Sequence, residues 1–464
     1  MSAIRDQATA AQHRASQPEA SVWVSASAGT GKTKVLTDRV LRLLLAGVEP
    51  ARLLCLTFTN AAAAEMRNRI NNKLGAWTTI GTRDLTAQLG ALLDRAASSD
   101  ECAVARKLFA NVLDAPGGMK IMTIHAFCQS VLRRFPLEAA IVPHFEVMDQ
   151  HAAAEILGEA QAELMGRLRG DRVTATIANA WSEVTRNVHE TKFAALISEL
   201  ASERGRLTRL TNDAGGVDEL IARTARFLGI DADATEETVI AMACADDAFN
   251  GDNLRRAAEV MAQGSPADRK RGVVLEGWLD AGSTRVKEFD TYVAVFLTDK
   301  LKARKRLYTQ GAVACLQELP HIIEAEQARL LDVVDQQRKV KLIHATAALL
   351  RLGLALLDIY KTKKAARARL DYDDLVLEAR NLLQGDGLAR WVQFKLDGGL
   401  DHILIDEAQD SNPDQWQVVS ALAEEFFTGL DDDGPSIPRS VFAVGDTKQS
   451  IFSFQRADPS AFES

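Results

Sequence analysis

Cysteine is scarce in this chain, with five residues among 464, and the five are scattered without any Cys-x-x-Cys pair. This pattern excludes a disulfide framework and the usual cysteine-based metal site, and it favours a reducing compartment. Residues 1–20 lack the apolar segment of a secretory signal. No uninterrupted apolar run reaches the roughly 18 residues that a membrane span requires. We therefore expect a cytoplasmic protein without a membrane span.

An excess of positive charge is also lacking. Lysine and arginine number 55 against 63 aspartate and glutamate residues, which gives a formal net charge of −8. Binding to nucleic acid would thus have to depend on local basic patches rather than on overall charge. The length and the 47% hydrophobic content are typical of a globular protein with about two or three domains.

The most informative stretch is residues 26–33, Ala-Ser-Ala-Gly-Thr-Gly-Lys-Thr. The apolar run 22–24 precedes it and a helical pattern at 35–45 follows it, which is the strand, loop and helix context that a phosphate-binding loop requires. Backbone N–H groups of such a loop and the helix N-terminus hold phosphates, and the lysine reaches the β- and γ-phosphates. The alternative is an ordinary Gly/Ser turn before a helix, and Ala26 replaces the glycine that usually opens the motif.

Two side chains, those of Gln12 and Thr33, add to this prediction. Gln12 lies shortly before the first apolar run, and a carboxamide can read the N6/N7 edge of adenine because it donates and accepts at once. The alternative is a surface glutamine. Thr33 is expected to place its hydroxyl on Mg²⁺. The residues predicted to bind the nucleotide are Gln12, Ala26, Ser27, Ala28, Gly29, Thr30, Gly31, Lys32, Thr33 and Lys34.

Five short apolar runs each end in polar or aromatic residues before a helix or loop begins. They lie at residues 22–24, 53–58, 120–125, 402–405 and 441–446. They predict an α/β fold with a parallel sheet, in which ligands lie beyond the carboxyl ends of the strands. The five ends would then share one edge of the sheet.

Two adjacent carboxylates follow the fourth run. Asp406 is predicted to hold Mg²⁺ opposite Thr33, and Glu407 is predicted to orient the attacking water as a base. Gln449, beyond the last run, is placed to contact the γ-phosphate. The predicted catalytic residues are Glu407, Lys32 and Gln449. The alternative for the carboxylates is an acidic pair that only favours a helix dipole.

Residues 137–370 differ in character, since strand signals nearly vanish and apolar residues recur at helical spacing. We expect an all-α domain of these residues, inserted into an α/β domain made by residues 1–136 and 371–464. Three basic clusters lie in the predicted insertion, at residues 269–271, 300–306 and 361–369. Such clusters are usually solvated helix faces, but three of them in an acidic protein favour a surface for the phosphate backbone of a nucleic acid.

Aromatic residues stand beside the predicted strand ends, namely Phe58, Phe452 and Phe454. They offer stacking faces for unpaired bases, although a phenylalanine is more often a core residue. His125, at the end of the third apolar run, is a further candidate for this edge, and a packed histidine is its alternative.

Six stretches, taken in order, resemble the motifs of superfamily 1 helicases of the UvrD/Rep/RecB type. They are Gln12 and residues 26–33, 56–66, 123–128, 406–410 and 445–457. Details within that superfamily are similar to the AddA subunits of bacterial AddAB helicase–nucleases, of the alphaproteobacterial type. These details lie at residues 23–26, 36–40, 143–149 and 445–455. The helical middle of the chain matches only in position and character.

The resemblance implies a RecA-like motor domain, 1A, with the helical domain as its 1B insertion. It implies an ATP- and Mg²⁺-dependent helicase that moves 3′–5′ along single-stranded DNA, also meets duplex DNA, and acts in double-strand break repair by recombination. It further implies that the partner is an AddB-type nuclease subunit. Gln449 is implied to link the γ-phosphate to DNA. The residues implied to touch the DNA strand are Phe58, Asn60, His125 and Phe454.

Three positions depart from the family pattern. Ala61 stands where lysine or arginine is common, which removes a phosphate contact, and Phe454 replaces a frequent tryptophan. Arg456 stands where glycine is usual, at a position that needs backbone freedom. The family's second motor domain, with its arginine finger, and its nuclease domain are absent from these 464 residues. We therefore expect an N-terminal fragment that binds nucleotide weakly and hydrolyses it slowly or not at all.

Two other functions fit the same motifs. One is a Rep- or UvrD-like helicase of another repair or replication pathway. The other is a nucleotide-dependent single-strand DNA-binding module without motor activity.

Overall fold

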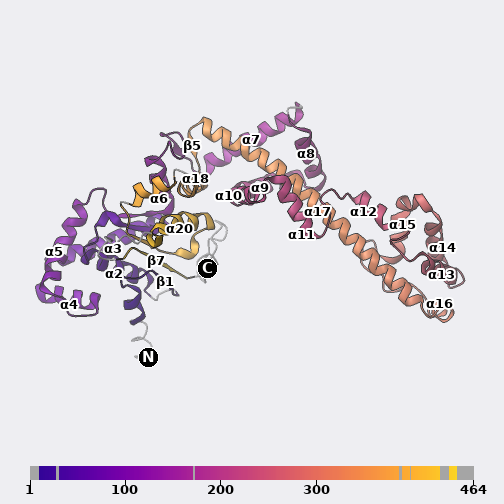
Figure 1. Ribbon diagram of the computed structural model, residues 1–464, viewed down its shortest axis with the longest axis horizontal. Helices are drawn as coiled ribbons and strands as arrows, with labels where there is room; N and C mark the ends of the chain where they lie inside the picture. The colour runs from indigo at the N-terminus through magenta and orange to yellow at the C-terminus, as the bar shows by residue number, and fades with distance from the viewer. Residues whose placement is uncertain are drawn as a thin grey trace. The chain divides into compact units, whose positions relative to one another are not determined.

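The computed structural model describes residues 10–27, 31–170, 173–385, 389–397, 399–428 and 438–446. The chain divides into two compact units (Figure 1). The first, which we call the sheet unit, comprises residues 1–158 and 361–464, and the second, the helical unit, comprises residues 159–360.

A five-stranded parallel sheet forms the centre of the sheet unit. Its strands, in spatial order, are β1 (Val22–Ser25), β7 (Ser440–Gly445), β6 (His402–Ile405), β2 (Leu53–Thr57) and β3 (Lys120–Thr123). Because all neighbouring strands are parallel, their carboxyl ends lie along the same edge, which we call the carboxyl edge. The predicted α/β fold with one shared edge is confirmed.

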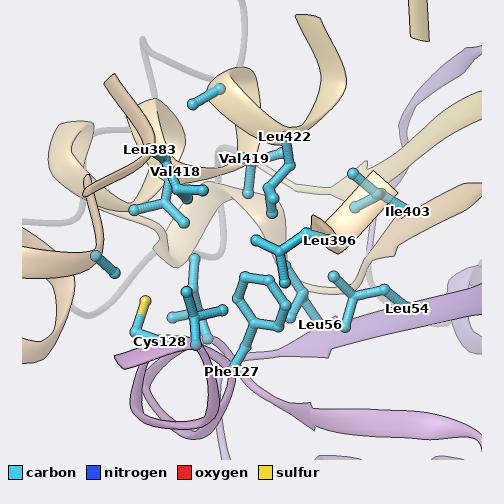
Figure 2. Packing of buried hydrophobic residues seen from close by; sticks show 14 of the residues in the cluster. Leu54, Leu56, Phe127, Cys128, Leu383, Leu396, Ile403, Val418, Val419 and Leu422 are labelled. Atoms are coloured by element: carbon cyan, nitrogen blue, oxygen red, sulfur yellow. The ribbon is translucent and has the colours of Figure 1, made fainter. Parts of the chain in front are cut away.

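Helices cover both faces of this sheet. Successive side chains of a strand point to opposite faces, so Leu54 and Leu56 join one apolar cluster while Leu53 and Cys55 join the other. The helices that pack on the Leu54 face are α6 (Ile124–Arg134), α18 (Tyr372–Gln384), α19 (Ala389–Asp397) and α20 (Pro413–Thr428) (Figure 2). Those on the opposite face are α2 (Lys32–Leu45), α3 (Asn60–Thr79), α4 (Thr82–Leu93) and α5 (Ser99–Asp114). The three central strands, β2, β6 and β7, are buried on both faces, which explains why they read as continuous apolar runs.

The third strand is shorter than the apolar run 120–125 suggested. It ends at Thr123, whose hydroxyl accepts a hydrogen bond of 3.2 Å from the N–H of Ala126 and so caps α6. His125 therefore lies in the first turn of a helix and not at a strand end.

A second, two-stranded parallel sheet lies beside the points where the chain leaves and re-enters the sheet unit. It pairs β4 (Glu146–Val147) with β5 (Arg369–Leu370). Residues 137–158 and 361–370, which we predicted to be part of the insertion, fall in the sheet unit, where Phe145 and Leu370 pack in its apolar core. The role of the helical unit as a 1B insertion stays a prediction.

The helical unit is built from helices throughout, apart from an isolated bridge between Leu297 and Ala303 in its described residues. Its core includes Trp278 stacked on Tyr292, with ring centroids 3.8 Å apart. The helices that make up this unit, including two that continue into the sheet unit, are α7 (Gln150–Arg169), α8 (Ala175–Asn187), α9 (Glu190–Ser202), α10 (Arg204–Ala214), α11 (Val217–Leu228), α12 (Glu236–Ala243), α13 (Gly251–Ala262), α14 (Pro266–Asp280), α15 (Arg285–Phe296), α16 (Gln310–Cys315) and α17 (Leu319–Ala366).

Helix α17 is far longer than the helical pattern at 343–360 indicated. Among the helices that the structure describes, it alone is long and apolar enough to cross a membrane by composition, with a mean hydropathy of 1.7 over 18 residues. This is weak evidence, because the core helix of a globular protein meets the same criterion. Leu330 and Val334 of α17 belong to the core of the helical unit, and Arg351 pairs with Asp218 at 2.7 Å.

The buried histidine of β6 yields a prediction about acid stability. His402 is 1% exposed, its Nδ1 lies 2.9 Å from the Ser440 hydroxyl, and burial lowers its pKa to about 4. Between pH 6.5 and 4 the unfolded chain binds a proton that the folded chain does not, so the free energy of unfolding should fall as the pH falls, by on the order of 3 kcal/mol. Urea unfolding of His402→Asn should show a shallower pH dependence than the wild type. The exposed His144→Asn should keep the wild-type slope, and equal slopes for all three proteins would contradict this account.

Candidate functional site

The carboxyl edge brings together segments that are far apart in the sequence. The loop at residues 26–33 follows β1, Asp446 follows β7, and Asp406 follows β6. Since β7 lies between β1 and β6, the loop and the acidic pair Asp406–Glu407 are separated by a single strand. Phe58 follows β2 on the other side of β6.

Gly31 is the N-cap residue of α2, directly before Lys32. Its φ of 86° is left-handed, a conformation that suits glycine. A Cβ added here would lie 3.2 Å from Nε2 of Gln12, so the glycine also permits the close approach of that carboxamide. No described side chain caps α2, which leaves the first N–H groups of the helix suited to an anion. Ala28, Gly29 and Thr30 lie outside the described residues.

Lys32 and Glu407 form an ion pair across the carboxyl edge. The Nζ atom of Lys32 lies 3.0 Å from Oε2 of Glu407, and the lysine side chain is 9% exposed against 39% for the glutamate. Glu407 has a left-handed φ of 51°, which non-glycine residues seldom adopt and which is often retained at functional sites. The lysine predicted to bind phosphate and the predicted base are thus in direct contact.

Asp406 is buried beside this pair. Its Oδ1 accepts a 3.1 Å hydrogen bond from the N–H of Glu407. Burial, together with the adjacent charge of Glu407, raises the pKa of Asp406 to about 6, while the positive charge of Lys32 opposes the rise. A divalent cation would relieve this repulsion, and carboxylate and hydroxyl oxygens are the ligands that Mg²⁺ prefers.

The protein side chains available to a metal ion are few. In the part of the chain that the structure describes, no group of three or more His, Cys, Asp or Glu side chains is placed to hold a metal ion. Mg²⁺ bound through Asp406 and Thr33 would therefore take its other ligands from phosphate and water, as Mg²⁺ usually does at nucleotide sites.

Gln409 is a residue of this site that sequence reasoning missed. It is 1% exposed, and its Nε2 donates a 2.7 Å hydrogen bond to Oε2 of Glu407. Its Oε1 accepts a 2.9 Å hydrogen bond from the N–H of Asp446, just after β7. The side chain thus connects the predicted base to the end of the last strand. Its only sequence signal was membership of the motif at residues 406–410.

Of the residues predicted to contact DNA, the three that the structure describes lie on the β2 and β3 side of the carboxyl edge, and they are Phe58, Asn60 and His125. Phe58 is partly exposed and, with Asp406 and Trp416, lines a small pocket. Asn60 is exposed at the start of α3. His125 makes an edge-to-face contact with Tyr372, with centroids 5.5 Å apart.

The remaining residues contribute less to the described site. Tyr372, which the sequence analysis did not single out, is 49% exposed beside His125. Lys34 has a 63% exposed side chain, 4.0 Å from Asp38 on the surface of α2. Gln449 and Phe454 lie outside the described residues.

Comparison with known proteins identifies the relatives of this chain. Residues 6–464 match the sequence model of the UvrD/REP helicase N-terminal domain. Proteins named as the AddA component of an ATP-dependent helicase/nuclease are similar over 95% of the chain: 26% identical in Lactobacillus acidophilus, 25% in Latilactobacillus sakei and 28% in Pelotomaculum thermopropionicum. The chain covers 35%, 48% and 34% of these three proteins, respectively.

These findings confirm the resemblance to UvrD/Rep-type helicases and to AddA subunits. The narrower alphaproteobacterial resemblance stays a prediction, as do the roles assigned to individual residues. Because the chain spans about a third to a half of the length of these relatives, the activity of a whole protein is a matter for proposal.

The Lys32–Glu407 pair yields a prediction about nucleotide affinity. A nucleotide phosphate must displace Glu407 from Lys32, so Glu407→Gln should tighten the binding of ATP with Mg²⁺ by roughly fivefold, about 1 kcal/mol. Isothermal titration calorimetry of both proteins measures this change. Glu49→Gln is the matched control, because Glu49 pairs with Arg52 at 3.6 Å before the start of β2, remote from the carboxyl edge. Unchanged or weaker binding by Glu407→Gln would show that the ion pair does not compete with ATP.

Proposed function

The chain belongs to the UvrD/REP helicase family through its N-terminal domain, and on that premise we propose that it is the N-terminal motor part of an ATP-dependent 3′–5′ DNA helicase. We propose that it acts in the cytoplasm in double-strand break repair by recombination, as part of an AddA-type subunit that pairs with an AddB-type nuclease subunit. The names of its relatives, which describe one component of an ATP-dependent helicase/nuclease, support the pathway and the partner.

The observation that carries the proposal is the 3.0 Å contact between Lys32 and Glu407. It joins the helix of the phosphate loop to the acidic end of β6, which is the juxtaposition that ATP hydrolysis requires. Lys32, once released from Glu407, would bind the β- and γ-phosphates. Glu407 would then orient a water molecule in line with the γ-phosphate and accept its proton. Mg²⁺, held by Asp406 and Thr33, would supply neutralisation of the phosphate charge.

The DNA-binding part of the proposal has two supports. The first is the group of partly or fully exposed residues Phe58, Asn60, His125 and Tyr372, since aromatic faces at a polar edge suit unpaired bases. The second is a basic surface in the helical unit. Arg271 donates a 3.0 Å hydrogen bond to the carbonyl of Leu307, which brings the basic clusters 269–271 and 300–306 together.

Most basic side chains of this surface are exposed. They are Arg269, Lys270, Lys300, Lys302, Lys305 and Arg306. The third cluster, 361–369, is partly structural, because Lys364 is 3% exposed and donates to Asp371 at 3.0 Å and to Asp374. We therefore assign the phosphate-backbone contacts of the helical unit to the first two clusters.

Thermal unfolding tests the nucleotide site. ATP with Mg²⁺ should raise the melting temperature, because a ligand at a hundredfold excess over its Kd stabilises the folded state by about 2.7 kcal/mol, or several degrees. Lys32→Ala should abolish the rise. Lys107→Ala, at an exposed lysine of α5, should keep it. A normal rise in Lys32→Ala would refute the phosphate role of Lys32.

Salt-dependent DNA binding tests the basic surface. Replacing Lys302 and Lys305 together by alanine should lower the slope of log Kd against log salt concentration by about one for each lost phosphate contact. Fluorescence anisotropy with a labelled duplex measures the slope. The matched double variant replaces Lys339 and Lys341, which already pair at 2.9 Å with Asp335 and Glu236, and should leave it unchanged. Equal slopes in all three proteins would exclude this surface from DNA binding.

A further inference from the structure

Arg39 is a charged side chain buried inside the sheet unit, with 0% of its surface exposed. It lies on α2, about two helical turns after Lys32. Its Nη1 donates to the carbonyls of Ala15 at 3.2 Å and Gln17 at 2.5 Å. Its Nη2 donates to the carbonyl of Ala20 at 2.6 Å and to the hydroxyl of Ser440 at 3.0 Å. One guanidinium therefore binds three carbonyls of the N-terminal segment and one strand.

The three carbonyls belong to the segment that carries Gln12. Residues 10–15 are helical, and residues 16–21 connect this short helix to β1. Gln12, on the same helical stretch, comes close to Gly31, since a Cβ on that glycine would lie 3.2 Å from Nε2 of Gln12. Helix α2 thus meets the segment twice, through Gly31 at its start and through Arg39 further along.

The contacts of Arg39 suit a role in fixing the position of the N-terminal segment better than a role in stabilising the fold. Burial lowers the pKa of Arg39 to about 10, so the group stays charged at neutral pH, and its guanidinium lies 5.1 Å from the ring centre of Phe442. Buried cations stabilise a fold weakly compared with apolar side chains of similar volume. The planar fork of an arginine, however, fixes several acceptors in set directions.

We propose that Arg39 is a positioning residue for base selectivity, which holds the carboxamide of Gln12 at a fixed place relative to the phosphate loop. This proposal rests on the proposed function and on the prediction from the sequence that Gln12 reads adenine. A carboxamide discriminates adenine from guanine only when its donor and acceptor meet the base edge in register. If the segment around Gln12 shifts while the phosphate loop stays in place, the triphosphate still binds but the base is no longer read.

The experiment compares three ligands in the presence of Mg²⁺: ATP, GTP and inorganic tripolyphosphate. Their Kd values are measured by calorimetry for the wild type, Gln12→Ala, Arg39→Met and Arg39→Lys. Arg39→Met should weaken ATP binding about tenfold, the same loss that we expect of Gln12→Ala, and should leave the Kd of tripolyphosphate unchanged. The double variant Gln12→Ala/Arg39→Met should lose no more ATP affinity than either single variant, because both substitutions disable the same contact between Gln12 and the base. Arg39→Lys should fall between wild type and Arg39→Met.

A matched control separates positioning from general destabilisation. Arg106 on α5 also donates to three backbone carbonyls, those of Trp77, Thr78 and Ile80, at 2.9–3.1 Å. Arg106→Met removes an equivalent set of hydrogen bonds in the same unit, remote from Gln12 in sequence, and should keep the wild-type ratio of ATP to GTP affinity.

The outcomes distinguish a failure of the role of Arg39 from a failure of the proposed function. If Gln12→Ala loses selectivity but Arg39→Met and Arg39→Lys retain it, the role of Arg39 is refuted and the nucleotide site stands. If Gln12→Ala and the wild type show the same ratio, Gln12 does not read the base and the role of Arg39 falls with it. If Arg39→Met does not fold, Arg39→Lys decides: faster hydrogen exchange over residues 12–20 with unchanged selectivity would overturn the proposal. If the wild type binds none of the ligands, the proposed function itself fails.

Discussion

The parallel register of β1, β7 and β6 is the constraint on which the site depends. It places the carboxyl ends of these strands side by side, and so brings Lys32 within 3.0 Å of Glu407 although 375 positions separate them. An ion pair between a lysine and a carboxylate persists only while no stronger anion competes for the lysine. A nucleotide phosphate would be such a competitor, because it carries more negative charge than a carboxylate. In the function that we propose, nucleotide binding would have to rearrange this ion pair.

Buried polar side chains extend this response beyond the two charges. Gln409 contacts both Glu407 and the backbone of Asp446, and buried hydrogen-bonded groups of this kind resist change in one member without the others. Displacement of Glu407 would thus disturb the hydrogen bond between Gln409 and Asp446 at the end of β7. The chain continues from there toward Gln449. On the opposite side, Arg39 holds the N-terminal segment against α2 and β7. Helix α2 takes part in both polar networks, through Lys32 in the first and Arg39 in the second.

Local patterns were enough to predict the sheet and the shared edge at which its strands end. The three central strands are buried on both faces and so read as apolar runs. Gly31 and Lys32 belong to a motif that its flanking strand and helix identified. The missed features depend on contacts across the fold. Gln409 and Arg39 have ordinary sequence surroundings, and their roles arise from partners 37 and 401 positions away. The early end of β3 was missed because the cap at Thr123 competes with strand pairing.

The most direct test is the structure of this chain crystallised with Mg²⁺ and a non-hydrolysable ATP analogue. Our account predicts that the β- and γ-phosphates lie within hydrogen-bond distance of Nζ of Lys32, that Mg²⁺ lies beside Asp406, and that Glu407 has left Lys32. A nucleotide bound elsewhere, with the 3.0 Å contact between Lys32 and Glu407 intact, would contradict it.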